Sequence, residues 1–174
     1  MNTYWSQQEK KLRSLMSQTV LKLSGLEMAL REVGPTGLPV FQEPGVYCRQ
    51  LDHLRLELTT GDVIKLGTCR GHSSYGICLS SAEDASNYQG SPGSIFRLFE
   101  DLDVRGKIEA LDLKTDEEGC VIKLVLTFSH RELHIVAGEA LERFDDQLVF
   151  RSPEESLLLF QSAADIQRTP WVME

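Results

Sequence analysis

The sequence is poor in the features that mark nucleic-acid and membrane proteins. Among its 174 residues, 18 are Lys or Arg and 26 are Asp or Glu, which gives a formal net charge of −8. A nucleic-acid binder needs a basic face for phosphate, and a membrane-surface anchor needs clustered basic residues, so we expect neither partner. No segment approaches the roughly 20 apolar residues of a membrane-spanning helix. The polar N-terminus also lacks the apolar core of a signal peptide, and we therefore expect a cytoplasmic protein.

Cysteine and histidine are too sparse for a disulfide scaffold or a zinc site. The chain has four residues of each type, and no two cysteines form a C-x-x-C pair. Secreted proteins that depend on disulfides carry a higher density of cysteine, and zinc ligands usually come in close pairs. We therefore expect no metal, no cofactor and four reduced, mostly buried thiols, which are Cys48, Cys69, Cys78 and Cys120.

The common catalytic motifs are also missing. The sequence contains no G-x-S-x-G elbow, H-E-x-x-H zinc motif, dinucleotide-binding G-x-G-x-x-G or phosphate-binding P-loop. His130 and His134 have the spacing of the zinc motif, but Glu132 stands in the wrong position between them. Because such motifs place nucleophiles, bases, metals and phosphates, we expect no catalytic residues and a protein that is not an enzyme.

The length and composition favour a single domain over residues 1–174, since 41% of the residues are hydrophobic. We interpret residues 1–33 as a long N-terminal helix. Apolar side chains recur along it at alternating steps of four and three, and Ser6 and Glu9 have the spacing of a capping box. Two roles remain open for this helix: it covers one face of a sheet, or its heptad-like seam joins two copies in a homodimer.

The remaining chain alternates between apolar and polar residues, as β-strands do. Residues 34–45 are a Pro/Gly connector, and residues 46–174 form a β-rich body in which Thr60-Gly61-Asp62 is the turn of a hairpin. We therefore expect the α+β class, with the long N-terminal helix packed on a mostly antiparallel, curled or sandwich-like sheet of about seven to nine strands.

The longest irregular segment covers residues 80–93 and consists mainly of small and polar residues. Long loops in compact domains are often functional, so we consider this loop a candidate for interactions, with Tyr88 as a possible aromatic anchor. An alternative function places a small-ligand or catalytic pocket of the β-rich body beneath this loop.

The negative charge is unevenly distributed along the chain. Residues 1–33 carry five basic and three acidic side chains, whereas residues 100–119 carry three and eight, and residues 120–174 carry five and nine. We therefore expect an acidic surface on the C-terminal strands and turns, which would attract a basic protein partner. The candidate partner-binding residues are Tyr88, Asp101, Asp103, Asp116, Glu117, Asp145, Asp146, Glu154 and Glu155.

The C-terminal strand pattern resembles that of small bacterial toxin-immunity proteins. The residues that carry the resemblance are 133–140, 148–150 and 153–160, and the likeness extends to size, acidity and the lack of catalytic motifs. The resemblance implies a cytoplasmic protein that neutralises a cognate toxin by covering its active site. It implies no particular contact residues, because immunity families bind through surfaces that differ from one pair to the next.

Overall fold

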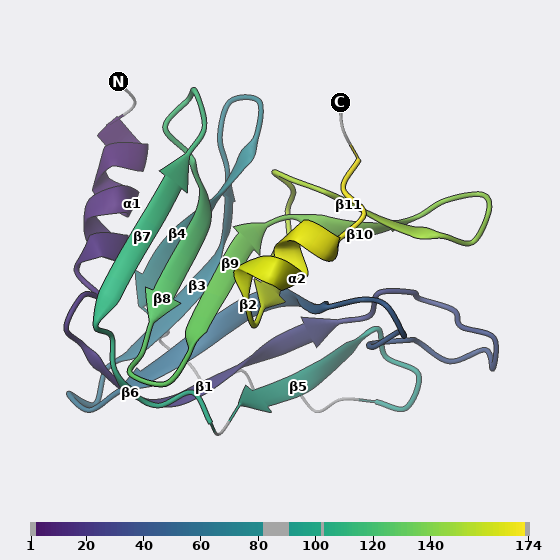
Figure 1. Cartoon of the computed structure of the whole chain (residues 1–174), viewed down its shortest axis with the longest axis horizontal. Helices are drawn as coiled ribbons and strands as arrows, with labels where there is room; N and C mark the ends of the chain where they lie inside the picture. The colour runs from purple at the N-terminus through teal and green to yellow at the C-terminus, as the bar shows by residue number, and fades with distance from the viewer. Residues whose placement is uncertain (1–2, 82–90, 102, 173–174) are drawn as a thin grey trace.

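The protein is built around one curved antiparallel sheet. The computed structural model describes residues 3–81, 91–101 and 103–172, and ten strands belong to this sheet, which curls into an open half-barrel (Figure 1). The expected α+β class is therefore wrong. Strands prevail, and the described residues contain only two short helices, α1 (Thr3–Arg13) and α2 (Ala163–Arg168).

The sheet branches at β2 (Cys48–Leu58). One edge of β2 pairs with β1 (Thr19–Met28), while the other edge pairs first with β12 (Leu157–Phe160) and then with β3 (Val63–Arg70). From β3 the sheet continues to β4 (Tyr75–Ser81), and from β12 it runs through β9 (Glu132–Ala137) and β8 (Val121–Thr127) to β7 (Ala110–Thr115). The two branches curl toward each other, so that β4 approaches β8.

Four short strands complete the fold. β5 (Phe96–Asp101) and β6 (Gly106–Lys107) pair with the outer edge of β1. β10 (Glu139–Glu142) and β11 (Leu148–Arg151) form a separate two-stranded sheet. The hairpin of β10 and β11 projects sideways from the half-barrel (Figure 1).

The expected helix over residues 1–33 is wrong. α1 ends at Arg13, Ser17 adopts the left-handed conformation with a φ of 69°, and the chain then enters β1. Ser6 lies inside α1, so it does not cap the helix. The seam that suggested a homodimerising helix is therefore split between a short helix and a strand.

β1 does not show the alternation expected of a strand because two of its core-facing positions are not apolar. The buried positions alternate from Leu23 through Gly25 to Glu27. Gly25 is required because a Cβ there would lie 2.3 Å from the carbonyl oxygen of His53. Glu27 is charged, yet only 1% exposed, because arginines from other strands bind it. The other apolar residues of β1 fit the spacing of a helix as well as that of a strand.

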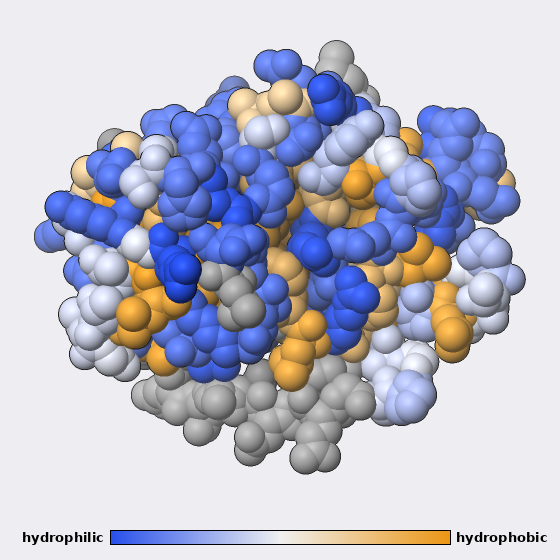
Figure 2. All heavy atoms as spheres, turned by 60° about the horizontal axis from the view of Figure 1, so that its bottom comes forward, coloured by the Kyte–Doolittle hydropathy of each residue, from blue (hydrophilic) through white to orange (hydrophobic). Residues whose placement is uncertain are grey.

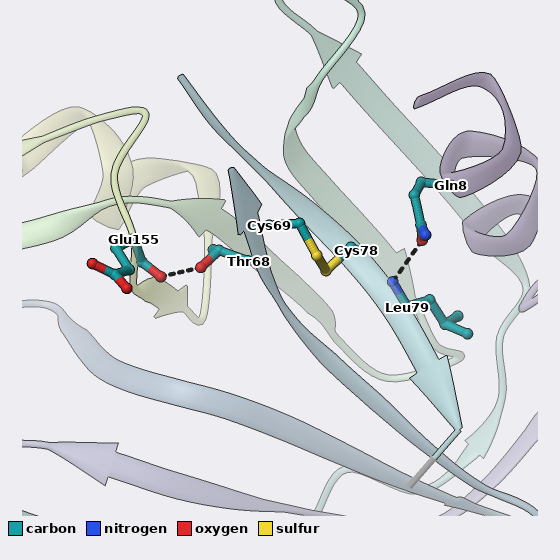
Figure 3. Close-up of a disulfide and its surroundings, with 6 residues drawn as sticks. All are labelled: Gln8, Thr68, Cys69, Cys78, Leu79 and Glu155. Carbon is teal, nitrogen blue, oxygen red and sulfur yellow. Dashed lines mark hydrogen bonds between the residues drawn. A yellow bond between two sulfur atoms is a disulfide. The ribbon is translucent and has the colours of Figure 1, made fainter. Parts of the chain in front are cut away.

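α1 packs along the edge of β4. Gln8 Oε1 accepts a hydrogen bond of 3.0 Å from the backbone N–H of Leu79, which occupies a donor at this sheet edge (Figure 3). The buried Trp5 ring lies directly over Gly76, where a Cβ would come within 2.8 Å of the ring. Leu12 enters the main core. The helix therefore covers an edge strand that would otherwise present free backbone groups.

Two hydrophobic cores lie on opposite sides of the sheet. The main core fills the inside of the half-barrel with residues of both branches, including Leu54, Leu124 and Ile135. The second core lies against the other face of β12 and β9, where the β10–β11 hairpin and the C-terminal segment cover it. Trp171 packs there, with its ring centroid 6.1 Å from that of Phe160.

The alternating pattern predicted the first hairpin of the β-rich body correctly. The hairpin expected around Thr60-Gly61-Asp62 occurs as β2 and β3, and the connection between the two strands covers residues 59–62. Tyr88 and the rest of residues 82–90 lie outside the described residues. Within the described part of the chain, no helix has the length and apolarity that a membrane crossing would need.

The expectation of four free thiols is wrong for one pair. Cys69 of β3 and Cys78 of β4 form a disulfide (Figure 3). In the strand register Cys69 lies opposite Gly76, and Cys78 lies opposite Gly67, so the two cysteines are diagonal neighbours. Only the pairing of the strands brings them together.

The other two cysteines, Cys48 and Cys120, are free and buried, as expected. Burial raises the pKa of the Cys48 thiol to about 12 and also raises that of Cys120. Because the thiolate is the reactive form, we expect both groups to react slowly in the folded protein.

Candidate acidic binding site

Two hairpin turns meet at one end of the half-barrel, and Asp116 joins them. Its Oδ2 accepts a hydrogen bond of 2.6 Å from the hydroxyl of Ser74, in the turn between β3 and β4. Its Oδ1 accepts two bonds of 2.9 Å, from the backbone N–H groups of Glu118 and Cys120 in its own turn. Asp116 was expected to contact a partner, but both of its oxygens are engaged within the protein.

Glu118 makes the second connection between these turns. Its carboxylate accepts hydrogen bonds from the backbone N–H groups of His72, at 3.1 Å, and Ser73, at 3.3 Å, as well as from the Ser73 hydroxyl. The hydroxyl bond is the main reason that the pKa of Glu118 lies below its usual value. Glu118 was not among the candidate residues, because its role depends on the approach of β4 to β8.

A hollow of about 420 Å³ lies beside the joined turns. Its lining includes Asp116, Glu117 and Glu118 from the β7–β8 turn, Arg151 from the end of β11, and Glu154 from the segment that follows β11. Arg151 and Glu154 are 3.5 Å apart and form an exposed ion pair. The structure thus brings together Asp116, Glu117 and Glu154, three of the residues that the sequence singled out.

Two further carboxylates extend this surface. Glu155 is exposed, and its backbone carbonyl accepts a hydrogen bond from the Thr68 hydroxyl (Figure 3). It contributes, together with Cys69 and Cys78, to the lining of a second hollow. Burial, together with the negative charges of Glu154 and Glu155, raises the pKa of Glu139 above its usual value. The charges of Glu154 and Glu155 therefore add to the effect of burial in opposing the ionisation of Glu139. We call the set of Asp116, Glu117, Glu118, Glu139, Glu154 and Glu155 the acidic end.

The other candidate carboxylates do not belong to the acidic end. Asp101 lies 3.4 Å from the guanidinium of Arg131, and its side chain also accepts the backbone N–H of Asp103 at 3.0 Å. The carbonyl of Asp103 is 2.9 Å from His130 Nε2. Asp101 and Asp103 therefore organise the connection after β5.

Asp145 and Asp146 form a third separate group, in the turn of the projecting β10–β11 hairpin. Asp146 adopts a left-handed conformation with a φ of 60°, and its carbonyl accepts a hydrogen bond of 2.6 Å from Arg31. Asp145 is exposed and lies 3.8 Å from Arg143. Tyr88, the remaining candidate, lies outside the described residues.

An ionic cluster that the sequence did not reveal lies around Glu27. The carboxylate of Glu27 accepts hydrogen bonds from Arg49, at 2.8 Å, and from Arg97, at 2.6 Å. Arg49 also stacks over Phe99, with 4.8 Å from its guanidinium carbon to the ring centroid. Because these charged groups satisfy one another, the cluster links β1, β2 and β5. The only signal in the sequence was a glutamate in an otherwise apolar segment.

Histidine–carboxylate pairs occur at two places on the sheet. His53 Nδ1 is 2.7 Å from Asp52, and His134 Nε2 is 3.0 Å from Glu132. In the described residues, no hydroxyl or thiol is bonded to either of these imidazoles, as a nucleophile would be. Nor do the described His, Cys, Asp and Glu side chains include a group of three that could hold a metal ion.

Comparison with known proteins adds no assignment to this site: no protein-family model matches the chain, and no curated protein matches it in sequence.

Proposed function

We propose that this protein is a non-enzymatic binding protein whose acidic end receives a basic protein partner. The observation that carries the proposal is the convergence of carboxylates from two connections, β7–β8 and β11–β12, at one hollow. Among the residues that line the hollow there, Arg151 is the one basic side chain against four acidic ones. The surface therefore has an excess of negative charge.

The pKa of Glu139 is raised mainly by burial, and the negative charges of Glu154 and Glu155 add to this effect. A cationic side chain placed near Glu154 and Glu155 would remove the repulsion that opposes the ionisation of Glu139. The hollow of about 420 Å³ is large enough for the end of a lysine or arginine side chain. Charge complementarity of this kind speeds association and excludes acidic competitors.

Within this class, we propose the role of a cytoplasmic immunity protein that covers the active site of a cognate toxin. The support is the resemblance of the segments that form β9, β11 and β12 to the C-terminal strands of immunity proteins, together with the acidic end. Disulfides rarely persist in a reducing cytoplasm. In that compartment we therefore expect Cys69 and Cys78 to be thiols.

The structure gives no support to the two other functions that the sequence suggested. A homodimer through a long N-terminal helix has lost its basis, because α1 ends at Arg13. A pocket beneath the loop of residues 80–93 would depend on residues 82–90, which lie outside the described residues.

The test is an identified partner whose binding depends on the acidic end. The tagged protein is expressed in its native cells, and proteins that copurify are identified by mass spectrometry. The variant Glu117→Lys/Glu155→Lys reverses two exposed charges at the acidic end. The control Glu109→Lys/Asp112→Lys makes the same change in net charge at exposed acids near and on β7.

We expect a basic partner to copurify with the wild type and the control but not with the variant at the acidic end. If that partner is a toxin, each of the three proteins can be coexpressed with it. The wild type and the control should then protect the cells, and the variant at the acidic end should not. A partner that is retained equally by all three proteins would refute the proposed site.

A further inference from the structure

The disulfide of Cys69 and Cys78 closes the β3–β4 hairpin near its tip. Cys69 is the residue before the last one of β3, just ahead of the turn of residues 71–74. Across the strands Cys69 faces Gly76, and Cys78 faces Gly67. Because glycine has no side chain, the disulfide takes the place of the side-chain pairs that normally join two strands at these positions.

This end of the hairpin holds the acidic end at two places. The turn of residues 71–74 lies beside the β7–β8 turn (Figure 1) and donates hydrogen bonds to Glu118 and Asp116. On β3, the Thr68 hydroxyl donates to the backbone carbonyl of Glu155 (Figure 3). The disulfide lies between these two contacts along β3. A change in the order of the hairpin would therefore reach carboxylates of both connections that form the acidic end.

The disulfide can be reached from solvent, whereas the free thiols are enclosed. Cys69 and Cys78 line a hollow of about 570 Å³, and Cys69 is only half-buried. A small thiol or disulfide reagent can attack the bond from this hollow. Cys48 and Cys120 are buried, and burial raises the pKa of both thiols. The pair can therefore open and close without exchange with the other two cysteines.

Binding at the acidic end would depend on the positions of charged groups. Figure 2 shows another face of the molecule, where hydrophobic side chains lie in small separate groups within a mostly hydrophilic surface. The described side chains on that face thus form no broad apolar patch of the kind that marks a docking surface. A charged surface whose groups are already fixed loses less conformational entropy on binding than a mobile one.

We propose that Cys69 and Cys78 are a reversible redox switch that sets the order of the acidic end. Its effect on binding rests on the proposed function of that surface. With the disulfide closed, the turn of residues 71–74 is held against Glu118 and Asp116. Opening frees the turn, so that it leaves these carboxylates more often and the partner binds more weakly.

The opening step is a thiol–disulfide exchange with a dithiol reductant. The S–S bond of Cys69 and Cys78 breaks, two electrons and two protons pass to them from the reductant, and the reductant leaves as a disulfide. In a reducing cytoplasm the pair is open, and a disulfide oxidant closes it by the reverse exchange. The structure shows the closed state.

The first test needs no partner. The folded protein is equilibrated with mixtures of reduced and oxidised dithiothreitol, the state of the pair is read by alkylation and mass spectrometry, and amide exchange is measured by NMR. The pair should open and close without unfolding. The amides of His72 and Ser73, which donate to Glu118, should exchange at least about tenfold faster in the open state. The amide of Gly61, in the β2–β3 turn, is the internal control and should not change.

A matched variant separates the switch from other effects of the reductant. Cys69→Ser/Cys78→Ser should show the fast exchange of the open state both with and without dithiothreitol. If this variant does not fold, the comparison of the two states of the wild type still gives the answer. A pair that stays oxidised until the protein unfolds, or equal exchange of His72 and Ser73 in both states, would overturn the proposal.

The second test uses the copurified basic partner. Titration calorimetry should show that the closed state binds it at least about threefold more tightly than the open state. Equal affinities would overturn the switch and leave the acidic end as a binding site. The absence of a basic partner would instead refute the proposed function, and the exchange measurement would still show whether the disulfide orders the turn.

Discussion

The Asp116 carboxylate accepts a 2.6 Å hydrogen bond from the Ser74 hydroxyl, and this bond joins two turns whose bonded residues are 42 positions apart in the chain. Together with Glu118, it connects the two branches of the sheet at the acidic end. The same residue that contributes negative charge to the hollow is therefore a structural link, whereas its neighbour Glu117 projects into solvent.

This difference predicts unequal effects of two adjacent substitutions. Asp116→Ala removes the acceptor of three hydrogen bonds and should lower the free energy of unfolding by about 2–3 kcal/mol. Glu117→Ala, in the same turn, should change it by less than about 0.5 kcal/mol, because an exposed side chain is removed. Urea unfolding of both variants measures the two values. Equal effects would show that the link between the turns contributes little to stability.

The cluster around Glu27 predicts a large effect at a site that sequence alone would not single out. Glu27→Gln removes the charge that Arg49 and Arg97 share and should cost about 2–4 kcal/mol of stability, because Glu27 is buried while bonded to both. The exposed ion pair of Lys22 and Glu100 is the comparison. Glu100→Gln should cost less than about 1 kcal/mol, and a similar loss for both variants would contradict the stabilising role of the ionic cluster around Glu27.

Glu139 and Glu118 should change the pH dependence of stability in opposite directions. The pKa of Glu139 is raised, so its ionised form destabilises the fold, and Glu139→Gln should be more stable than the wild type at neutral pH. This advantage should vanish as the pH falls below the ordinary pKa of a glutamate.

The pKa of Glu118 is lowered, so its ionised form stabilises the fold at neutral pH. Glu118→Gln should therefore be less stable than the wild type there, and the difference should shrink as acid protonates the wild-type carboxyl. Thermal melting of both variants between neutral and acidic pH gives the two signs. If both substitutions changed the melting temperature at neutral pH in the same direction, the pKa of one of the two glutamates would not be shifted as described.

The four cysteines should separate into two classes in a thiol assay. In the folded, oxidised protein we expect no rapid reaction, because Cys48 and Cys120 are buried and Cys69 is bonded to Cys78. Unfolding without reductant should expose two thiols, and unfolding with reductant should expose four. Four reactive thiols before reduction, in protein kept under air, would show that the pair does not form a disulfide.

The sequence predicted local strands well because their signal is local. Leu54, Leu56 and Leu58 alternate with polar residues ahead of a Thr-Gly-Asp turn, and the β2–β3 hairpin follows from that pattern alone. β1 was missed because its inner face includes Gly25 and Glu27. Gly25 is required by the close approach of His53, and Glu27 is paired with Arg49 and Arg97. These neighbours lie on other strands, so the sequence of β1 alone does not reveal them.

The same limit applies to the candidate site. Charge counting identified Asp116, Glu117 and Glu154 as candidates, but their meeting depends on the approach of two branches of the sheet. Charge counting also grouped these three residues with Asp101 and Asp145, which the fold places in other connections. Charge along the chain thus predicted an acidic C-terminal half, and only the fold divides that charge into separate surfaces.

The most direct test of the acidic end is the affinity of the copurified partner, measured by titration calorimetry at low and at physiological salt. We expect Glu117→Lys/Glu155→Lys to weaken binding at least about tenfold and to reduce its salt dependence, while Glu109→Lys/Asp112→Lys leaves both close to the wild type. An affinity and a salt dependence that are the same for all three proteins would contradict the proposed role of the acidic end.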